Sequence, residues 1–231
     1  DDRMIARERE EYDLADAVTV PSKFAYRSFL EEGFPEDKLH LIPYGVDTER
    51  FRPVDRPDPE TFEVLYVGLC SLRKGTPHLV RAFEAVRHPK KKLTVIGNVQ
   101  PNIRPVLEEA QGKMQIDVLG HLPQGELPGY MSRCHVFVLP SVEDGYGLVL
   151  SQAMACGAPV IATTNTGGEM LVDEGVEGFI VPVADDEAMA ARLQQLADDP
   201  DLRDRMGQAA LTRAKDMKGW SYYGDMVATM F

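Results

Sequence analysis

Cysteine is scarce in this 231-residue chain, with only Cys70, Cys134 and Cys156. An odd number at unrelated spacings supplies neither a disulfide framework nor a metal-ligand pattern. We therefore expect three reduced and mostly buried thiols, which is the usual state of cysteine in a cytosolic protein.

Long apolar runs and excess positive charge are also missing. No apolar run approaches the roughly 20 residues that cross a bilayer, and the opening DDRMIARERE lacks the apolar centre of a signal peptide. With 25 Lys and Arg against 37 Asp and Glu, the net charge is −12. The sequence thus lacks the basic face that nucleic-acid binding requires. We interpret the one basic cluster, Lys90 to Lys92, as a solvated corner between a helix and a strand.

What the chain does contain is a regular alternation of strand and helix patterns from Thr61 onward. Short apolar or β-branched runs alternate with segments of three-to-four-residue apolar spacing. Such alternation predicts an α/β fold, with a doubly wound parallel sheet and helices on both faces. The expected strands are 62–68, 92–97, 114–120, 135–140, 159–163 and 178–182, and the expected helices include 78–88, 104–110, 125–134 and 187–198.

The first sixty residues follow another pattern. A charged helix precedes ADAVTVPS, a second helix is expected over 23–32, and three prolines crowd the polar stretch that follows. The sequence begins at Asp1 with helical character, so we expect a segment cut from a longer chain. We predict four parts: 1–50, the tail of an otherwise absent N-terminal domain; 51–60, a linker; 61–217, the main α/β domain; and 218–231, a terminal helix that packs on the first part.

Two loops carry candidate chemistry, because ligands of open parallel sheets bind at the carboxyl ends of strands. In VGLCSLRKGTP (67–77), Arg73 and Lys74 lie close to the start of a helix, where backbone amides favour an anion. The sequence alone leaves a diphosphate site and a solvated basic turn equally open. The glycine spacing differs from that of a Walker loop.

The second loop lies in SVEDGYGLVLSQAMACGAPV (141–160). Its glycines let the backbone approach a ligand, and the amides from Gly145 to Leu148 can donate to phosphate or hydroxyl oxygens. Its carboxylates suit sugar hydroxyls better than phosphates. The pattern therefore indicates a ligand with an anionic part and a polyol part, although Asp144 as a plain helix cap is the simpler alternative.

PSVEDGYGLVLSQAMACGAPVIAT (140–163) resembles the donor-site motif of the retaining, GT-B-fold glycosyltransferases of family 4, in which two glutamates stand eight positions apart. VPSKFAYRSFLEEGFPEDKLHLIPYGVDTERFRP is similar to that family's exit from its N-terminal domain. VGLCSLRKG, TNTGGEMLVDEGVEGFIVP and WSYYGDM are similar to its phosphate loop, its following segment and its C-terminal crossover helix. The resemblance covers essentially the whole chain, in the right order.

The resemblance implies a role for each matching position. Lys74 and Arg73 would bind the diphosphate of a nucleotide-sugar and stabilise the leaving nucleotide, and Asp144 would hydrogen-bond a hydroxyl of the donor sugar. Gln152 would hold the nucleotide ribose. The remaining expected donor contacts are Gly68, Glu143, Gly145, Tyr146, Gly147 and Leu148. No metal or other cofactor is expected.

Three positions depart from the family pattern. Leu69 stands where the family usually has arginine, and Asp144 is one methylene shorter than the expected glutamate. Gln152 replaces the second glutamate and loses its charge. Glu143, next to Asp144, is an alternative acting carboxylate. These departures put the affinity for the donor in question rather than the fold.

The resemblance implies the donor-binding part of a retaining, hexosyltransferase-like enzyme that moves a sugar from a nucleotide diphosphate-sugar to an acceptor. Its expected setting is cytoplasmic synthesis of cell-surface polysaccharide or glycolipid, with any peripheral membrane contact made by the full-length protein. We expect the chain alone to transfer little sugar. The alternatives are a non-catalytic nucleotide-sugar-binding or scaffold module and, with a poorer motif fit, a GT-B epimerase or phosphorylase.

Other side chains are weaker candidates. We expect His121 to be structural or exposed, and Glu169 to be a first-turn acid that complements a helix dipole. Trp220 and Tyr222 are interpreted as packing residues between domains.

Overall fold

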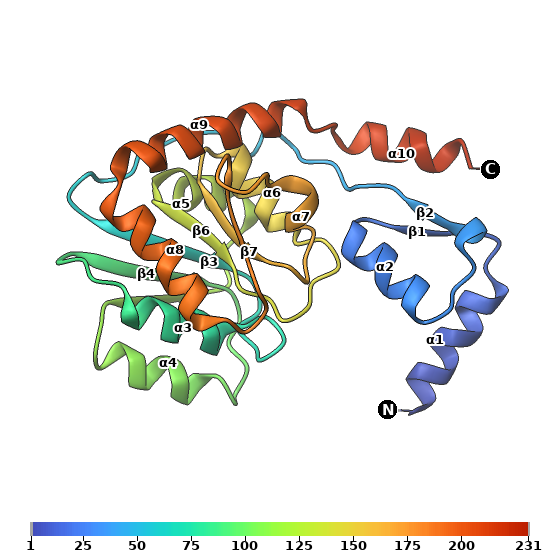
Figure 1. Cartoon of the computed structure of the whole chain (residues 1–231), viewed down its shortest axis with the longest axis horizontal. Helices are drawn as coiled ribbons and strands as arrows, with labels where there is room; N and C mark the ends of the chain where they lie inside the picture. The colour runs from blue at the N-terminus through green and yellow to red at the C-terminus, as the bar shows by residue number, and fades with distance from the viewer. Residues whose placement is uncertain (1, 231) are drawn as a thin grey trace.

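A six-stranded parallel sheet forms the centre of the computed structural model, which describes residues 2–230 (Figure 1). Asp1 and Phe231, the outermost residues of the predicted first and last parts, lie outside the described range. The strand order is β5-β4-β3-β6-β7-β8, and every neighbouring pair is parallel. The strands are β3 (Phe62–Val67), β4 (Lys91–Ile96), β5 (Ile116–Gly120), β6 (Val136–Leu139), β7 (Val160–Thr163) and β8 (Gly178–Val181).

Both faces of the sheet are covered, so the predicted fold class is confirmed. Along β3, Val64 and Tyr66 enter one buried cluster, whereas Leu65 and Val67 enter the other. The first cluster packs under α3 (Thr76–Ala85), α4 (Arg104–Gln111) and α8 (Asp186–Asp198). The second packs under α5 (Leu127–Arg133), α6 (Leu148–Ala155), α7 (Gly168–Leu171) and the end of α9 (Pro200–Asp216).

Residues 2–50 form a separate small unit beside this sheet (Figure 1). The elements are α1 (Asp2–Leu14), β1 (Val18–Val20), α2 (Lys23–Glu31), the short 3-10 helix η1 (Glu36–Lys38) and β2 (Leu39–Leu41). β1 and β2 pair in parallel as a two-stranded sheet of their own. The expected second helix is therefore confirmed as α2.

The segment predicted to be a linker, 51–60, has no helix or strand and is mostly exposed. Two contacts fix its start on the main domain. Phe51 is 2% exposed in the second cluster, and the Val54 amide donates to the Ser132 hydroxyl at 3.1 Å. The start of the linker is thus anchored to α5 rather than free in solvent.

The terminal helix α10 (Trp220–Ala228) runs from α9 back over the small unit (Figure 1). The rings of Trp220 and Tyr44 stack with centroids 5.6 Å apart. Gly45 lies so close that an added β-carbon would come within 2.3 Å of the Gly219 carbonyl carbon. The expected packing of this helix on the first segment is confirmed, although Tyr222 contacts the Lys218 ammonium instead, 3.9 Å from its ring centroid.

The solvated basic corner is wrong for one of its three lysines. The Lys91 ammonium donates to the carbonyl oxygens of Phe83, Glu84 and Val86 at the end of α3, at 2.9, 2.9 and 2.7 Å. It thereby adds a donor to carbonyls at a helix end, where intrahelical donors run out. Lys92 forms an ion pair with Asp117 at 3.0 Å.

The three cysteines are buried and unpaired, as expected. Burial raises the pKa of the Cys70 thiol to about 11 and that of Cys156 to about 12, so both thiols stay protonated at neutral pH. Within residues 2–230, no helix is long and apolar enough to cross a membrane. The same residues contain no cluster of His, Cys, Asp and Glu arranged to hold a metal ion.

Candidate functional site

The strand order reverses at the centre of the sheet, between β3 and β6. From β3 the chain winds outward to β4 and β5, then returns to β6 and winds the other way to β7 and β8. The loops after β3 and β6 therefore leave adjacent strand ends, and the crevice between such loops is where open α/β sheets bind ligands. These are the two loops that the sequence singles out.

Backbone contacts join the two loops directly. The Arg73 carbonyl oxygen accepts from the amides of Val142 and Glu143, at 2.9 and 3.4 Å. Gly75, with a left-handed φ of 67°, lies against Pro140, whose carbonyl oxygen would be 1.8 Å from an added β-carbon. The approach is therefore possible only for glycine.

Lys74 and Asp144 form the central charged pair of the site. The Lys74 ammonium lies 2.6 Å from Asp144 Oδ2, and the two side chains are 16% and 20% exposed. The Lys74 amide donates to the Ser71 hydroxyl at 3.1 Å, which fixes the turn that presents the side chain. The structure thus brings together the cation and the carboxylate that the sequence assigned to one site.

The same carboxylate holds its own loop. Asp144 Oδ1 accepts from the amide of Gly147 at 3.0 Å and, more weakly, from that of Tyr146 at 3.4 Å. In this conformation the two amides are occupied by Asp144, so a ligand can bind them only if the carboxylate moves. The amides of Gly145 and Leu148 have no acceptor within residues 2–230. The helix-cap alternative for Asp144 is also wrong, because the N-cap residue of α6 is Gly147.

The neighbouring pair is looser and more exposed. Arg73 donates to the Glu143 carbonyl oxygen at 3.2 Å and lies 3.6 Å from Glu143 Oε1, and the two side chains are 53% and 55% exposed. Leu69 is uncharged and 41% exposed, so it contributes no positive charge to the loop. Gly68 lies at the strand end, where its carbonyl oxygen would be 1.9 Å from a β-carbon on Gly97.

Gln152 lies on α6, one helical turn beyond the loop, and is 7% exposed. Its side-chain amide has no hydrogen-bond partner among residues 2–230. Gln152 therefore follows the loop closely in the sequence. In the structure, its side chain forms no hydrogen bond with the Lys74–Asp144 pair. A buried polar group of this kind has unused hydrogen-bonding capacity.

Three further contacts, which the linear sequence does not indicate, join the loop or the neighbouring α7 to the small unit. The Ser22 hydroxyl, fully buried at the start of α2, donates to the Gly145 carbonyl oxygen. The Tyr146 hydroxyl donates to the Tyr44 carbonyl oxygen at 3.1 Å, and burial raises the pKa of Tyr146 to about 12.

The third contact involves Glu169. It lies in the first turn of α7, as expected, and pairs with Arg27 of α2 at 2.7 Å. His121, by contrast, is exposed and contributes nothing to the loop contacts. The loop after β6 and α7 are thus tied to α2, more than a hundred residues earlier in the chain.

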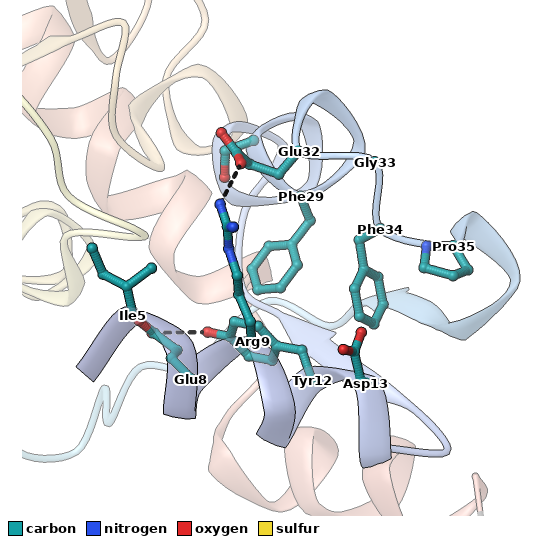
Figure 2. Close-up of a pocket in the computed structure, with 11 residues that line it drawn as sticks. Ile5, Glu8, Arg9, Tyr12, Asp13, Phe29, Glu32, Gly33, Phe34 and Pro35 are labelled. Carbon is teal, nitrogen blue, oxygen red and sulfur yellow. Dashed lines mark hydrogen bonds and ion pairs between the residues drawn. The ribbon is translucent and has the colours of Figure 1, made fainter. Parts of the chain in front are cut away.

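A cavity of about 600 Å³ lies elsewhere, between α1 and α2 (Figure 2). The rings of Tyr12, Phe29 and Phe34 meet edge to face along it, and Arg9 reaches Glu32 across it at 3.8 Å. Its walls are aromatic side chains and exposed ion pairs, without a convergent set of polar groups. The paired loops after β3 and β6 therefore remain the candidate site.

A doubly wound domain with a cation and a glycine loop at its reversal point has the arrangement with which open α/β folds bind ligands. Residues 47–213 match the model of the glycosyl transferases group 1 family, and residues 2–50 match the model of glycosyltransferase family 4. Since the first match covers well over half of the chain, this chain belongs to the group 1 glycosyltransferases.

Curated relatives agree with this assignment. D-inositol 3-phosphate glycosyltransferase from Pseudarthrobacter chlorophenolicus is 32% identical over 205 residues, which are 82% of this chain and 49% of the relative. The GDP-mannose-dependent α-(1-6)-phosphatidylinositol monomannoside mannosyltransferase from Mycolicibacterium smegmatis is 29% identical over 94% of this chain and 62% of the relative. The chain thus spans about half to three fifths of the length of these relatives.

Solved structures show the same fold. Sucrose-phosphate synthase from Thermosynechococcus elongatus superposes with a TM-score of 0.85 at 27% identity, over all of this chain and 61% of that one. HepE from Anabaena, solved in complex with UDP and glucose, has a TM-score of 0.81 at 19% identity, over 94% of this chain and 63% of that one. The architecture is that of the GT-B glycosyltransferases.

Proposed function

We propose that this chain is the donor-binding part of a retaining glycosyltransferase, which transfers a sugar from a nucleotide diphosphate-sugar to an acceptor. One observation carries the proposal: the reversal point of the sheet brings Lys74, Arg73 and the glycine loop of 143–148 to a single place. The complexes of HepE with UDP and with UDP-glucose support a nucleotide-sugar as the ligand class.

Each residue has a proposed part in this reaction. Lys74, with Arg73 beside it, binds the diphosphate and stabilises the charge that develops on the leaving nucleotide. The unpartnered amide of Leu148, at the start of α6, donates to a phosphate oxygen. Asp144 accepts from a hydroxyl of the donor sugar, and Gln152 from the ribose. Gly68 and Gly145 let the ligand approach the backbone, and no metal takes part.

The acceptor is proposed to bind mainly to parts of the full-length protein outside this chain. The relatives are named for different acceptors, among them an inositol phosphate and a phosphatidylinositol mannoside. Sugar transfer is common to those names, and the acceptor is not. We therefore expect the chain alone to bind nucleotide and to transfer little sugar.

A panel of UDP, GDP and ADP, each with and without a sugar, tests the donor assignment by calorimetry on the full-length protein. We expect one nucleotide to bind, and Lys74→Ala to abolish that binding. The matched control is Lys92→Ala, which removes a lysine from another Lys–Asp pair, far from the loop. Binding that survives Lys74→Ala would overturn the phosphate assignment.

The second candidate is a non-catalytic nucleotide-sugar-binding or scaffold module. It is favoured by the departures at Leu69 and Gln152, which remove an expected positive charge and an expected negative charge. Nucleotide binding without release of free sugar or transfer to any acceptor would support a non-catalytic binding module. Absence of binding for every nucleotide would support a scaffold.

A further inference from the structure

The Asp144 carboxylate occupies Lys74, a donor proposed for the diphosphate, together with two amides of the same loop. It accepts from the Lys74 ammonium at 2.6 Å and from the Gly147 and Tyr146 amides at 3.0 and 3.4 Å. A cation beside backbone amides at a helix start is the arrangement that binds phosphate oxygens. In the structure this arrangement is filled by a carboxylate from the same chain.

We propose that Asp144 is an internal anion that competes with the nucleotide diphosphate for Lys74 and the loop amides. This inference rests on the function proposed above. The site then has two states. In one, Asp144 holds Lys74; in the other, a phosphate oxygen holds Lys74, and the released carboxylate turns to a ligand hydroxyl.

Partial burial makes the competition strong. The two side chains are 16% and 20% exposed, so neither charge is well hydrated once its partner leaves. The exchange is favourable only when both charges regain partners. A phosphate oxygen can accept from Lys74, and a hydroxyl of the donor sugar can donate to Asp144.

Discrimination between donor and product follows from this requirement. A nucleotide diphosphate-sugar supplies both new partners, whereas a bare nucleotide diphosphate supplies only the phosphate. The bare product would leave Asp144 without a hydrogen-bond donor, and the carboxylate would then recapture Lys74. Asp144 therefore weakens the binding of the product more than that of the donor, which favours product release.

Asp144→Asn separates charge from shape. The asparagine oxygen still accepts from the Gly147 and Tyr146 amides, so the loop keeps its turn, but the charge that competes for Lys74 is gone. We expect this variant of the full-length protein to bind the preferred member of UDP, GDP and ADP about five- to tenfold more tightly than wild type does, as expected for loss of a partly buried ionic competitor. Wild type should bind the nucleotide-sugar more tightly than the bare nucleotide, and the variant should lose that preference.

Asp117→Asn is the matched control. Asp117 pairs with Lys92 at 3.0 Å, so the substitution removes the same charge from another Lys–Asp pair. We expect less than a twofold change in its nucleotide affinity. A second variant, Asp144→Ser, also removes the competing charge, while its hydroxyl oxygen can still accept from a loop amide. It should show the same gain in affinity for bare nucleotide, which tests the inference even if the asparagine variant folds poorly.

The outcomes of this experiment separate the inference from the proposed function. If Asp144→Asn binds bare nucleotide no more tightly than wild type, while Lys74→Ala abolishes binding, the internal competitor is wrong and the donor site stands. If neither wild type nor Asp144→Asn binds any nucleotide, the proposed function itself is wrong. If Asp117→Asn tightened nucleotide binding to the same degree, the gain seen with Asp144→Asn would come from the change in net charge alone. That result would overturn the inference.

Discussion

Gly75 lies against the carbonyl oxygen of Pro140, where a β-carbon would come within 1.8 Å. The contact joins the loop after β3 to the end of β6, the two places from which the site is built. Gly75 also has a left-handed φ of 67°, which disfavours any side chain. The geometry of the candidate site therefore depends on a residue that provides no chemistry.

Replacing Gly75 by alanine should destabilise the protein and disturb the site. The added methyl group meets backbone that cannot move without shifting a central strand, so we expect a loss of about 2 kcal/mol or more. At this chain length such a loss lowers Tm by about 4 °C or more. Thermal unfolding, followed by nucleotide calorimetry on the folded variant, measures both effects.

Gly129→Ala is the control for that substitution. Gly129 lies in α5 with no atom within 4 Å of an added β-carbon, and alanine favours a helix over glycine. We expect an unchanged or slightly raised Tm. Equal effects at the two glycines would show that the close approach to Pro140 has no special importance.

The Ser22 hydroxyl should matter to the loop that it touches as well as to its own helix. It accepts from the Ala25 amide as the N-cap of α2 and donates to the Gly145 carbonyl oxygen. Ser22→Ala removes both bonds from a fully buried position, so we expect a loss of about 1–2 kcal/mol. Hydrogen exchange at residues 143–148 should also become faster, because Gly145 loses its anchor.

Two other serine variants make this test specific. Ser28→Ala removes a hydroxyl that donates to the Ala25 carbonyl oxygen within the same helix, and it should leave exchange at 143–148 unchanged. Ser22→Thr keeps the hydroxyl and should restore slow exchange. If Ser22→Ala lowers Tm while exchange in the loop stays slow, the link from α2 to the loop is wrong and only the helix cap matters.

His135 should make the fold sensitive to mild acid. Its Nδ1 accepts from the Glu63 amide at 2.9 Å, and its side chain is almost wholly buried. Burial, and then the nearby Arg203 charge, lower the pKa of His135 from 6.5 to about 4. Between these values the unfolded chain binds a proton that the folded chain does not, so stability rises with pH. This contribution is fully present above pH 6.5 and is lost as pH falls toward 4.

Comparison of wild type with His135→Asn isolates this effect from the titration of carboxylates. Asparagine offers an oxygen in place of Nδ1 but does not titrate. We expect the urea unfolding free energy of wild type to fall by up to about 3 kcal/mol more than that of the variant between pH 6.5 and 4. Parallel pH profiles for the two proteins would contradict the lowered pKa.

The central fold could be predicted from the sequence because its strands are buried on both sides. A run such as Val136–Leu139 is apolar throughout, and all four of its residues are buried in β6. The meeting of the two candidate loops followed from the same reasoning, since Arg73 and Glu143 each lie beyond the end of such a run. Strand ends that face one edge of a parallel sheet bring their loops together, whatever the loops contain.

Contacts between distant residues could not be predicted in this way. The sequence shows that Asp144 is an acid beside glycines, but its pairing with Lys74 depends on two loops meeting 70 residues apart. Ser22 is 123 residues from Gly145. Lys91 was misread because its charge suggested solvent, whereas three carbonyl oxygens at the end of α3 hold it. In each case, residue type gives the capacity for a bond, and the fold supplies the partner.

Gln152→Glu tests the largest departure from the family motif. Gln152 is 7% exposed and has no hydrogen-bond partner among residues 2–230, so a carboxylate there would be largely desolvated, with only the small solvent contact that its polar atoms keep. We expect the nucleotide-free variant to lose about 1–3 kcal/mol of stability. The proposed ribose hydroxyls would donate to that carboxylate more strongly than to an amide oxygen. We therefore expect nucleotide affinity to rise by about tenfold.

The gain should depend on the ribose hydroxyls themselves. We expect the preferred nucleotide to bind the glutamate variant more tightly than wild type, and its 2′,3′-dideoxy form to gain nothing, because it has no hydroxyl to donate. Gln208→Glu, an exposed change on α9, controls for added negative charge and should alter neither affinity. Equal gains for the ribose and dideoxyribose forms would contradict the ribose contact. They would leave Gln152 as a residue of the α6 interior, buried for packing alone.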